Sequence, residues 1–406
     1  MEIPIVNNPE ILDEFISKYR SAFPEIRRFR HFSELISALN ISEKRSIAHL
    51  NSIMSDHVNQ SNINRFLASK FDKEAIFRRN IDLINSIEND GVLAIDDTIV
   101  EKTGRHIEGA GWIFDHSIGK NVFGMQLATC TLSGEYGFYP ISAGIYRRLE
   151  YLEVEEKGEE YMTKIDMQIQ TIGKCISAGL NFHTVVGDIW YFTKDMARFL
   201  SSKNLNWVFQ SKGNRKIKIK GRWTTLDLVP LSYPDSATMK ISGNTYSTWE
   251  VYGKMPGIGS VKVIISEGIN GKRYYVTNCT KWKAKRILGT YLQRWDIETM
   301  HRDLKQDGLG HIFLRKLCKT DLYLRLIVTG RVLLEIASIK SLCKYPGLNN
   351  SVEKRKRWVS FELLKSMAKT IRRFGNRFMD ALEISITNPY RSTRNVFFAM
   401  YNRGKI

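Results

Sequence analysis

Four acidic side chains in this sequence could take part in metal chemistry. Asp96 and Asp97 end the short apolar run GVLAIDD, Asp188 ends the apolar run FHTVVGD, and Glu298 lies in a segment with helical spacing. Carboxylates at the ends of neighbouring strands can converge on one point, and a helix packed across the sheet can add another. Such a cluster is costly without a cation because like charges repel, and Mg²⁺ or Mn²⁺ prefers oxygen ligands.

This arrangement predicts chemistry on phosphodiester bonds. Two divalent ions held about 4 Å apart can activate a water or a 3′-hydroxyl on one side and stabilise the leaving oxygen on the other. The alternative is that these acids are helix caps or salt-bridge partners, which is the ordinary role of a single surface acid.

The segment around Glu298 strengthens the metal interpretation. Tyr291, Arg294, Glu298 and Lys305 fall within roughly a 60° arc if the whole segment is one helix with 3.6 residues per turn. We expect a phosphate-facing ridge, in which the acid binds metal, the two bases hold backbone phosphates, and the phenol packs against or donates to the DNA backbone. A solvated salt-bridge ladder is the alternative.

The elements that would position these residues follow from periodicity. Between residues 91 and 210 the pattern predicts three strands, a helix, a strand, a second helix and a final strand. Ser133, Gly134 and Gly137 mark a turn between the second and third strands, and Gly179 ends the first helix. Asp97 would then lie on the first strand and Asp188 at the end of the fourth.

Helices are expected on both sides of this unit. Residues 10–90 read as helical, with Ser42 and Ser61 as N-caps of two short helices. These could form a helix-turn-helix that presents Asn62, Asn64 and Arg65, or could be plain helical packing. The segment 311–406 is helical and basic.

Residues 211–272 differ in composition and predict additional β structure. There Lys216, Lys218, Lys220 and Arg222 alternate, so one strand would present all four on one face, with Lys212 and Arg215 adding to the patch. Such an edge could follow a phosphate backbone. The alternative is an edge strand that lysines guard against aggregation.

The charge of the whole chain points to a polyanionic partner. Its 406 residues include 61 Lys and Arg against 42 Asp and Glu, a formal net charge of +19, which favours DNA, RNA or an anionic membrane. The five cysteines form no CxxC pair, which argues against zinc and suits a reducing cytosol. We see neither a signal peptide nor a membrane span, and expect no membrane partner.

With these residues in view, the chain resembles the DDE insertion-sequence transposases. The spacing Tyr-x₂-Arg-x₃-Glu-x₆-Lys from Tyr291 to Lys305 is similar to their signature helix. LAIDDTIVEK resembles their first-Asp strand, where the acid directly before Thr is the ligand, which favours Asp97 over Asp96. VVGDIWYF resembles their second-Asp strand, although relatives often carry a charged residue where Ile189 and Trp190 stand. The resemblance covers about residues 90–310.

The resemblance implies an α/β fold: a ribonuclease H-like mixed sheet with flanking helices and a β-rich insertion between the fifth strand and the Glu-bearing helix. The implied division is 1–88, a helical DNA-binding region; 89–210, the first part of the core; 211–272, the insertion; 273–345, the rest of the core with the signature helix; and 346–406, a basic helical region.

The resemblance also implies a function. Asp97, Asp188 and Glu298 would be the catalytic and metal-binding residues of a DNA transposase, holding two Mg²⁺ or Mn²⁺ ions per active site. Such enzymes cleave double-stranded DNA at terminal inverted repeats and transfer the strands into target DNA by a cut-and-paste route. They often pass through hairpin ends and work as a homodimer. A cytoplasmic, nucleoid-associated prokaryotic protein is expected.

In relatives that form hairpins, an aromatic residue of the insertion stacks on a flipped base. Trp223, Trp249 and Trp282 are the candidates here, and each could instead belong to the core. Two other functions stay open: a metal-dependent DNA nuclease without strand transfer, and a domesticated, non-catalytic DNA-binding protein. The intact acids and signature spacing speak against the second.

Overall fold

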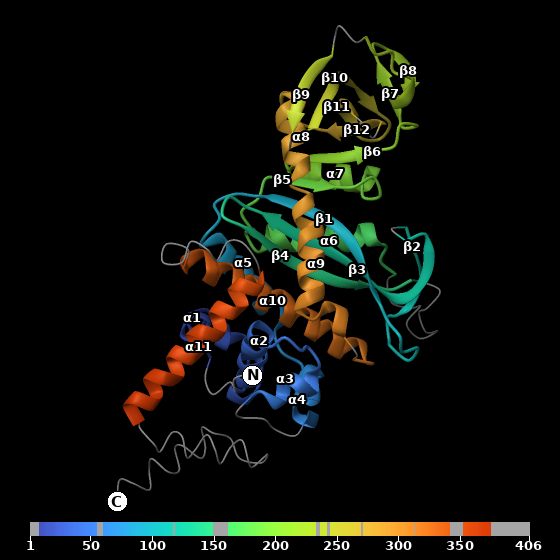
Figure 1. The fold of residues 1–406 in the computed structure, drawn as a ribbon. Coiled ribbons are helices and arrows are strands. Elements are labelled where there is room, and N and C mark those ends of the chain that lie inside the picture. The colour runs from blue at the N-terminus through green and yellow to red at the C-terminus, as the bar shows by residue number, and fades with distance from the viewer. Residues whose placement is uncertain are drawn as a thin grey trace, which may run out of the picture.

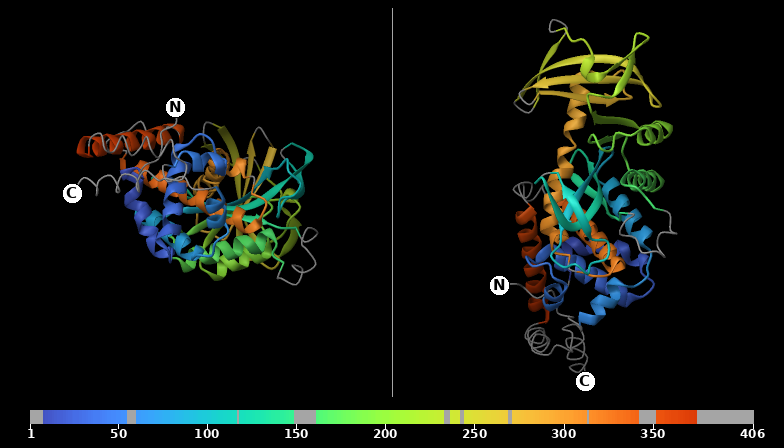
Figure 2. Two further views of the ribbon diagram at one scale, coloured as in Figure 1. Left: turned by 90° about the horizontal axis from the view of Figure 1, so that it is seen from below. Right: turned by 90° about the vertical axis from the view of Figure 1, so that its right-hand side faces the viewer.

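The computed structural model describes residues 8–54, 60–116, 118–148, 161–232, 236–241, 244–268, 271–312, 314–341 and 352–374. Figure 1 shows an elongated molecule, with helices from both ends of the chain gathered at one pole, a mixed sheet with helices in the middle, and a β-rich unit at the other pole. Figure 2 shows the same order from two further sides. The predicted α/β class is confirmed.

The N-terminal part is helical, as predicted. Its elements are α1 (Glu10–Ile16), η1 (Ser17–Ala22), α2 (Ile26–Ile41), α3 (Ile47–Ser52), α4 (Gln60–Leu67) and α5 (Lys73–Asn85). The prediction that Ser42 caps a helix is wrong, because its hydroxyl is engaged with the backbone of Lys44 and it ends α2. Ser46 caps α3 instead, accepting the N–H of His49 at 3.2 Å.

The central sheet has the strands that the sequence predicted and one more. Its elements are β1 (Val92–Glu101), β2 (Gly111–Asp115), β3 (Lys120–Ser133), β4 (Phe138–Tyr146), α6 (Lys164–Ser177), β5 (Thr184–Gly187), α7 (Lys194–Ser202) and β6 (Asn206–Ser211). β1 runs parallel to β5, and β5 runs parallel to β6. β3 is antiparallel to both β1 and β4. The short edge strand β2, which pairs with β3, was not predicted.

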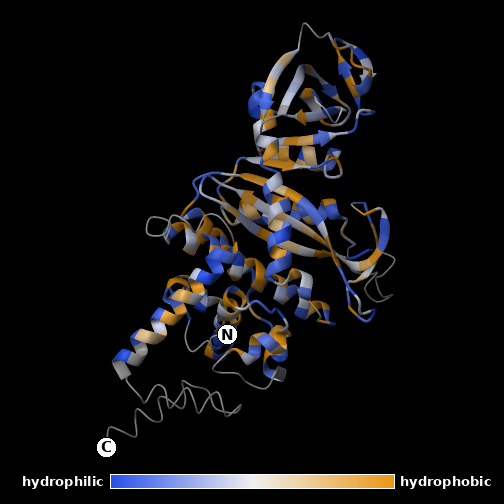
Figure 3. Cartoon of the chain, in the orientation of Figure 1, coloured by the Kyte–Doolittle hydropathy of each residue, from blue (hydrophilic) through white to orange (hydrophobic). Residues whose placement is uncertain are grey.

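Burial explains why β1 and β5 lie at the centre. Val92 to Ile95 and all of β5 are buried, as expected for strands of a parallel pair covered on both faces. Figure 3 shows apolar residues recurring along the strands of the central sheet. The acids that follow the apolar runs therefore reach the edge of the buried zone, which is where the sequence placed them.

A buried glutamate holds the β3–β4 turn. The carboxylate of Glu88, fully buried, accepts the N–H groups of Glu135, Tyr136 and Gly137 and the hydroxyl of Tyr139. Gly134 is required there, since a Cβ would lie 2.2 Å from the Glu88 carboxyl carbon. The turn fixes the register of β3, and with it the position of Thr129 beside the acids of β1.

Residues 211–272 are rich in strands, as predicted. They are β7 (Lys216–Ile219), β8 (Arg222–Thr225), β9 (Ala237–Ile241), β10 (Asn244–Met255), β11 (Gly259–Gly268) and the first two residues of β12 (Gly271–Thr277). Because β12 pairs with β6, these strands continue the central sheet in the order β6-β12-β11-β10-β7-β8, with β9 on β10.

The prediction that four basic residues alternate on one strand face is wrong. β7 ends at Ile219, and Lys220 and Gly221, both with positive φ (46° and 85°), form a two-residue hairpin turn. Lys218 pairs across the hairpin with Trp223, so Lys216, Lys218 and Trp223 share a face. Arg222 lies on the opposite face.

The predicted long helix around Glu298 is two helices. α8 (Ala284–Leu292) packs on β5, β6 and β12, whereas α9 (Trp295–Asp307) packs on β1 and β3. Gln293 and Arg294 lie at the break. At this break, the backbone carbonyl of Gln293 accepts a hydrogen bond from the Ser133 hydroxyl at 3.3 Å.

The last described helices are α10 (Leu317–Ser341) and α11 (Val352–Phe374). Arg331 of α10, 2% exposed, forms ion pairs with Asp303 and Asp307 of α9 and with Glu335 of its own helix. This network joins the Glu298-bearing helix to the helical pole. Among the helices that the structure describes, none is both long and apolar enough to cross a membrane.

Candidate active site

The two neighbouring acids of β1 face opposite sides of the sheet. Asp96 pairs with Thr129, whose hydroxyl lies 2.6 Å from Nε2 of His301 on α9, so Asp96 is on the α9 side. Asp97 is on the α6 side, because successive side chains of a strand alternate. Its Oδ1 lies 3.1 Å from Nζ of Lys164 and accepts the hydroxyl of Tyr191 at 3.0 Å.

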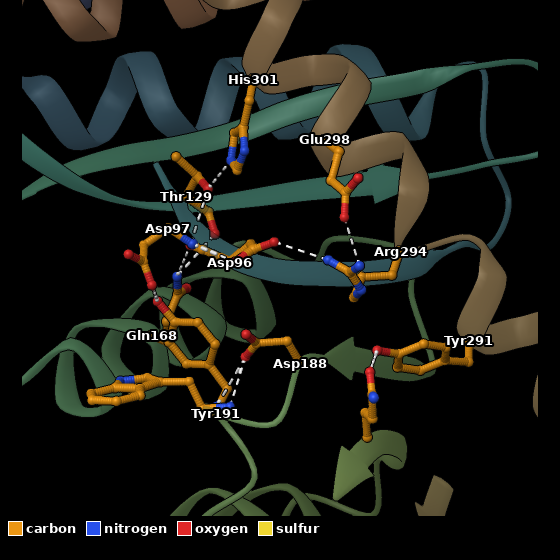
Figure 4. A network of polar contacts seen from close by, with 12 residues as sticks. Asp96, Asp97, Thr129, Gln168, Asp188, Tyr191, Tyr291, Arg294, Glu298 and His301 are labelled. Atoms are coloured by element: carbon orange, nitrogen blue, oxygen red, sulfur yellow. Dashed lines mark hydrogen bonds and ion pairs between the residues drawn. The ribbon is translucent and has the colours of Figure 1, made fainter. Parts of the chain in front are cut away.

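Arg294 joins the strand acid to the helix acid. Its Nη1 lies 3.0 Å from Oδ2 of Asp96, and its Nη2 lies 2.6 Å from Oε1 of Glu298 (Figure 4). Burial, and then the charge of Asp188, raises the pKa of Asp96 to about 7. The contact with Arg294 lowers the pKa of Asp96, but by less than burial and the charge of Asp188 raise it.

Asp188 sits at the end of β5, directly after a tightly packed glycine. A Cβ on Gly187 would lie 2.6 Å from the Phe209 ring, so no larger residue fits beneath the acid. Oδ1 of Asp188 accepts the N–H groups of Trp190 (2.9 Å) and Tyr191 (3.3 Å). Burial raises the pKa of this carboxyl.

These carboxylates lie near one another without forming a finished metal site. Asp188 is close enough to raise the pKa of Asp96, and Asp97 contributes to the raised pKa of Asp188. In the part of the chain that the structure describes, no three His, Cys, Asp or Glu side chains are arranged to hold one ion as they stand. The guanidinium of Arg294 lies between Asp96 and Glu298, where it balances their charge.

The donor set nevertheless fits a hard divalent cation. All four acids offer only oxygen ligands, as Mg²⁺ and Mn²⁺ prefer. Within the described residues, both hydrogen bonds to Asp188 go to Oδ1, so Oδ2 of this half-buried residue can accept a cation or water.

Two residues of the predicted helix ridge have different surroundings. Tyr291 is buried, donates its hydroxyl to Oε1 of Gln210 at 3.1 Å, and packs against Tyr275. The phenol therefore lies in the packing between α8 and the sheet and does not face the surface as we predicted. Lys305 is exposed on α9, beyond the helix break.

The basic residues of the insertion also differ in how exposed they are. Lys212, Lys216 and Lys218 are exposed. Arg215 is half-buried, donates to the carbonyl of Phe192, and lies 4.8 Å from the centre of that ring. Arg215 thus links the insertion to the loop after Asp188 through its contacts with Phe192.

The three candidate tryptophans differ in burial and in their contacts. Trp249 is 4% exposed and donates its indole N–H to the carbonyl of Ser232, so it belongs to the core. Trp282 is half-buried, with Arg286 at 4.0 Å from its ring centre. Trp223 is 56% exposed, and Nζ of Lys218 lies 5.8 Å from its ring centre.

Several residues at this site were missed by sequence analysis. Lys164, Tyr191 and Gln126 surround Asp97 from three different elements, and no local pattern marks them. His301, one turn after Glu298, was available as a Glu-x-x-His pattern. Burial, and then the charge of Lys305, lowers the pKa of His301 to about 4, so the imidazole is neutral at pH 7.

Comparison with known proteins gives a consistent assignment. The family model described as "Transposase DDE domain" matches residues 88–329. The chain is 25% identical over 230 residues to the "Probable transposase for insertion sequence element IS701" of Microchaete diplosiphon, an alignment that covers 54% of this chain and 58% of that protein. The chain therefore spans less than two thirds of that relative.

A solved structure, the "Drosophila P element transposase strand transfer complex", is 12% identical, with 52% of this chain and 53% of that chain covered. Its TM-score is 0.23. The family match includes the strand acids and the helix acid, and it confirms the resemblance seen in the sequence. The chain belongs to the transposase DDE domain family.

Proposed function

We propose that this protein is a DNA transposase that cleaves the ends of its element and transfers the freed strands into target DNA. The observation that carries the proposal is that Asp96 of β1 and Glu298 of α9 share Arg294, with Asp188, directly after β5, close enough to raise the pKa of Asp96. The raised pKa values of Asp96 and Asp188 show that these two carboxylates are unfavourable as anions where they stand, which suits a site that takes up cations.

By the family resemblance, Asp97, Asp188 and Glu298 are the residues that would hold two Mg²⁺ or Mn²⁺ ions, and Asp96, which shares Arg294 with Glu298, is the alternative ligand on β1. When bound, such ions lower the pKa of an attacking water or 3′-hydroxyl and stabilise the leaving oxygen. The role that we assign to Arg294 is to neutralise Asp96 and Glu298 in the free protein and to bind a backbone phosphate when DNA arrives. Tyr291 holds the helix break against the sheet.

The strand order supports a ribonuclease H-like core. β1 lies between the antiparallel β3 and the parallel β5, with β4 and β6 outside them. We propose the division into 1–88, 89–210, 211–272, 273–345 and 346–406 on the same basis, with β12 as the strand that returns the chain from the insertion to the core.

The exposed face of β7, β8 and β10 supports a path for DNA across the insertion. Lys254 pairs with Lys218, so Lys216, Lys218, Lys254 and Trp223 lie on one face, which is also the face that α8 covers further along the sheet. Exposed lysines around an aromatic ring suit a backbone with accessible bases. We propose that Trp223 is the residue that stacks on a base flipped from a hairpin end.

A second basic surface lies at the helical pole. Arg65 of α4 lines an open groove together with Arg315, Lys316 and Lys319 at the start of α10. This groove supports the proposal that the N-terminal region binds the terminal repeats. Because transposition must bring two ends together, we propose that the active complex is a homodimer.

The direct test is an assay with Mg²⁺, a labelled duplex that carries the terminal inverted repeat flanking the gene, and a target plasmid. We expect both cleaved and joined products. Cleavage without joining would show a nuclease, and binding without cleavage would show a DNA-binding protein.

The assignment of Asp97 over Asp96 has its own test. Asp97→Asn is expected to lower cleavage by about a hundredfold or more, since removing a metal ligand costs several kcal/mol in the transition state. Asp96→Asn is expected to cost about tenfold, because Arg294 keeps its bond to Glu298. Single-turnover cleavage rates of the two variants decide between them. The reverse order would make Asp96 the ligand.

Lys305 offers a test of the DNA path. Lys305→Ala is expected to weaken DNA binding and to reduce the slope of log K against log salt by about one phosphate contact. The measurement is fluorescence anisotropy between low and moderate salt. Lys203→Ala is the control, because α7 packs on the opposite face of β6 from α8. Equal salt slopes for both variants would remove Lys305 from the interface.

A further inference from the structure

An exposed tryptophan stands directly beside Asp188. The Trp190 side chain is 60% exposed, whereas the next two residues, Tyr191 and Phe192, are fully buried. A single exposed apolar side chain is ordinary on a protein surface. The position of Trp190 is not ordinary, because its backbone N–H donates to Oδ1 of Asp188 at 2.9 Å.

Lys164 contacts both the indole of Trp190 and the proposed ligand Asp97. Nζ of Lys164 lies 4.8 Å from the centre of the Trp190 ring and 3.1 Å from Oδ1 of Asp97. The side chain of Lys164 is only 13% exposed, so the cation is held in place between the ring and the carboxylate. Trp190 is therefore oriented by its backbone bond to Asp188 and by Lys164, which in turn pairs with Asp97.

These surroundings match a nucleobase better than an apolar protein surface. The remaining ring surface is open to solvent, and the groups next to it are a buried ammonium and two carboxylates. A planar base can stack on the ring while its neighbouring phosphate lies near the lysine, and stacking on aromatic side chains is tolerant of base identity. An apolar protein side chain would lie against these charges and offer them no polar contact.

We propose that Trp190 is a DNA-contacting residue of the active site, and that its indole stacks on the base next to the scissile phosphodiester. The proposal rests on the proposed function, since it takes the acids to mark the site of cleavage. A base inside a duplex has no free face, so the base that stacks must have left its pair or must lie at a strand end. Trp190 then favours melting of the DNA at the cut.

Two measurements test this with the full-length protein. The first places 2-aminopurine at each position within two nucleotides of the cut in terminal-repeat duplexes and records fluorescence on binding without divalent ions. We expect stacking on Trp190 to quench the probe at one position. Quenching should be lost in Trp190→Ala and largely kept in Trp190→Phe. Trp112→Ala, which removes a tryptophan 53% exposed on β2, is the control.

The second measurement compares Mg²⁺-dependent cleavage of a paired duplex with that of a duplex mismatched at the flanking position. On paired DNA, Trp190→Ala is expected to cleave about tenfold more slowly, the size of one lost base stack. The mismatch should restore most of that rate, because the base is already unpaired. A merely structural role would lower both rates equally.

The outcomes separate the two proposals. If Trp190→Ala and Trp112→Ala gave the same quenching and the same response to the mismatch, the role of Trp190 would be overturned. Cleavage by the wild-type protein would still support the proposed function. Wild-type protein that cleaves neither duplex would overturn the proposed function. The fluorescence measurement would still decide whether Trp190 touches a base, because it needs no cleavage.

Discussion

Replacing Asp188 with asparagine is expected to lower DNA cleavage by about a thousandfold or more, the factor that corresponds to a loss of about 4 kcal/mol in the transition state. Asparagine keeps the size of the side chain and can still accept the N–H groups of Trp190 and Tyr191. It removes the negative charge that a divalent cation requires. DNA affinity should stay within about twofold, because phosphate contacts supply most of it.

The matched control is Asp195→Asn, which removes an exposed acid from the first turn of α7. We expect this variant to cleave at the wild-type rate. The measurements are single-turnover cleavage of an end-labelled duplex and a binding isotherm for each variant. Cleavage by Asp188→Asn at the rate of Asp195→Asn would contradict the metal assignment and would favour the non-catalytic reading.

Replacing Arg331 with methionine is expected to lower the free energy of unfolding by about 3–5 kcal/mol, the usual cost of removing one partner from a buried ion pair. Arg331 balances Asp303, Asp307 and Glu335, all at most 6% exposed, and its loss would leave those carboxylates with too little positive charge. Lys356 and Arg355 of α11 pair with Asp307 and Glu335 and would compensate only in part.

Urea unfolding followed by circular dichroism measures this effect. Arg357→Met is the control, because its pair with Glu353 is largely exposed and exposed pairs contribute little. We expect no measurable change in the urea midpoint of the control. An Arg331→Met variant with the same midpoint would show that the network is dispensable. A variant that folds but cleaves slowly would show that the network also positions α9 and Glu298.

Much of the site was predictable because its acids end apolar runs. A run such as VLAI or TVVG has to be buried, and the charged residue that follows has to reach the boundary of the core, so the placement of Asp97 and Asp188 follows from burial alone. The spacing of Arg294, Glu298 and Lys305 also predicted a shared helix. Glu298 and Lys305 lie on α9, and Arg294 directly precedes it.

Other features depended on contacts that local patterns do not contain. The alternation from Lys216 to Arg222 is real in the sequence, yet the backbone turns at Lys220 and Gly221 and sends Arg222 to the other face. Tyr291 keeps its place in the signature spacing, yet the sheet formed by β6 and β12 covers it. Both outcomes depend on contacts with other strands, with β8 in the first case and with β6 and β12 in the second.

By itself, the sequence determined the family and most of the order of the elements, and it marked the acids that we propose as ligands, because hydrophobic periodicity and fixed spacing are local properties. Only the tertiary structure decided which acid faces which helix, that Arg294 stands between Asp96 and Glu298, and that Lys164 and Trp190 adjoin the site. Those relations join residues far apart in the chain, and they arise when the sheet and its helices pack together.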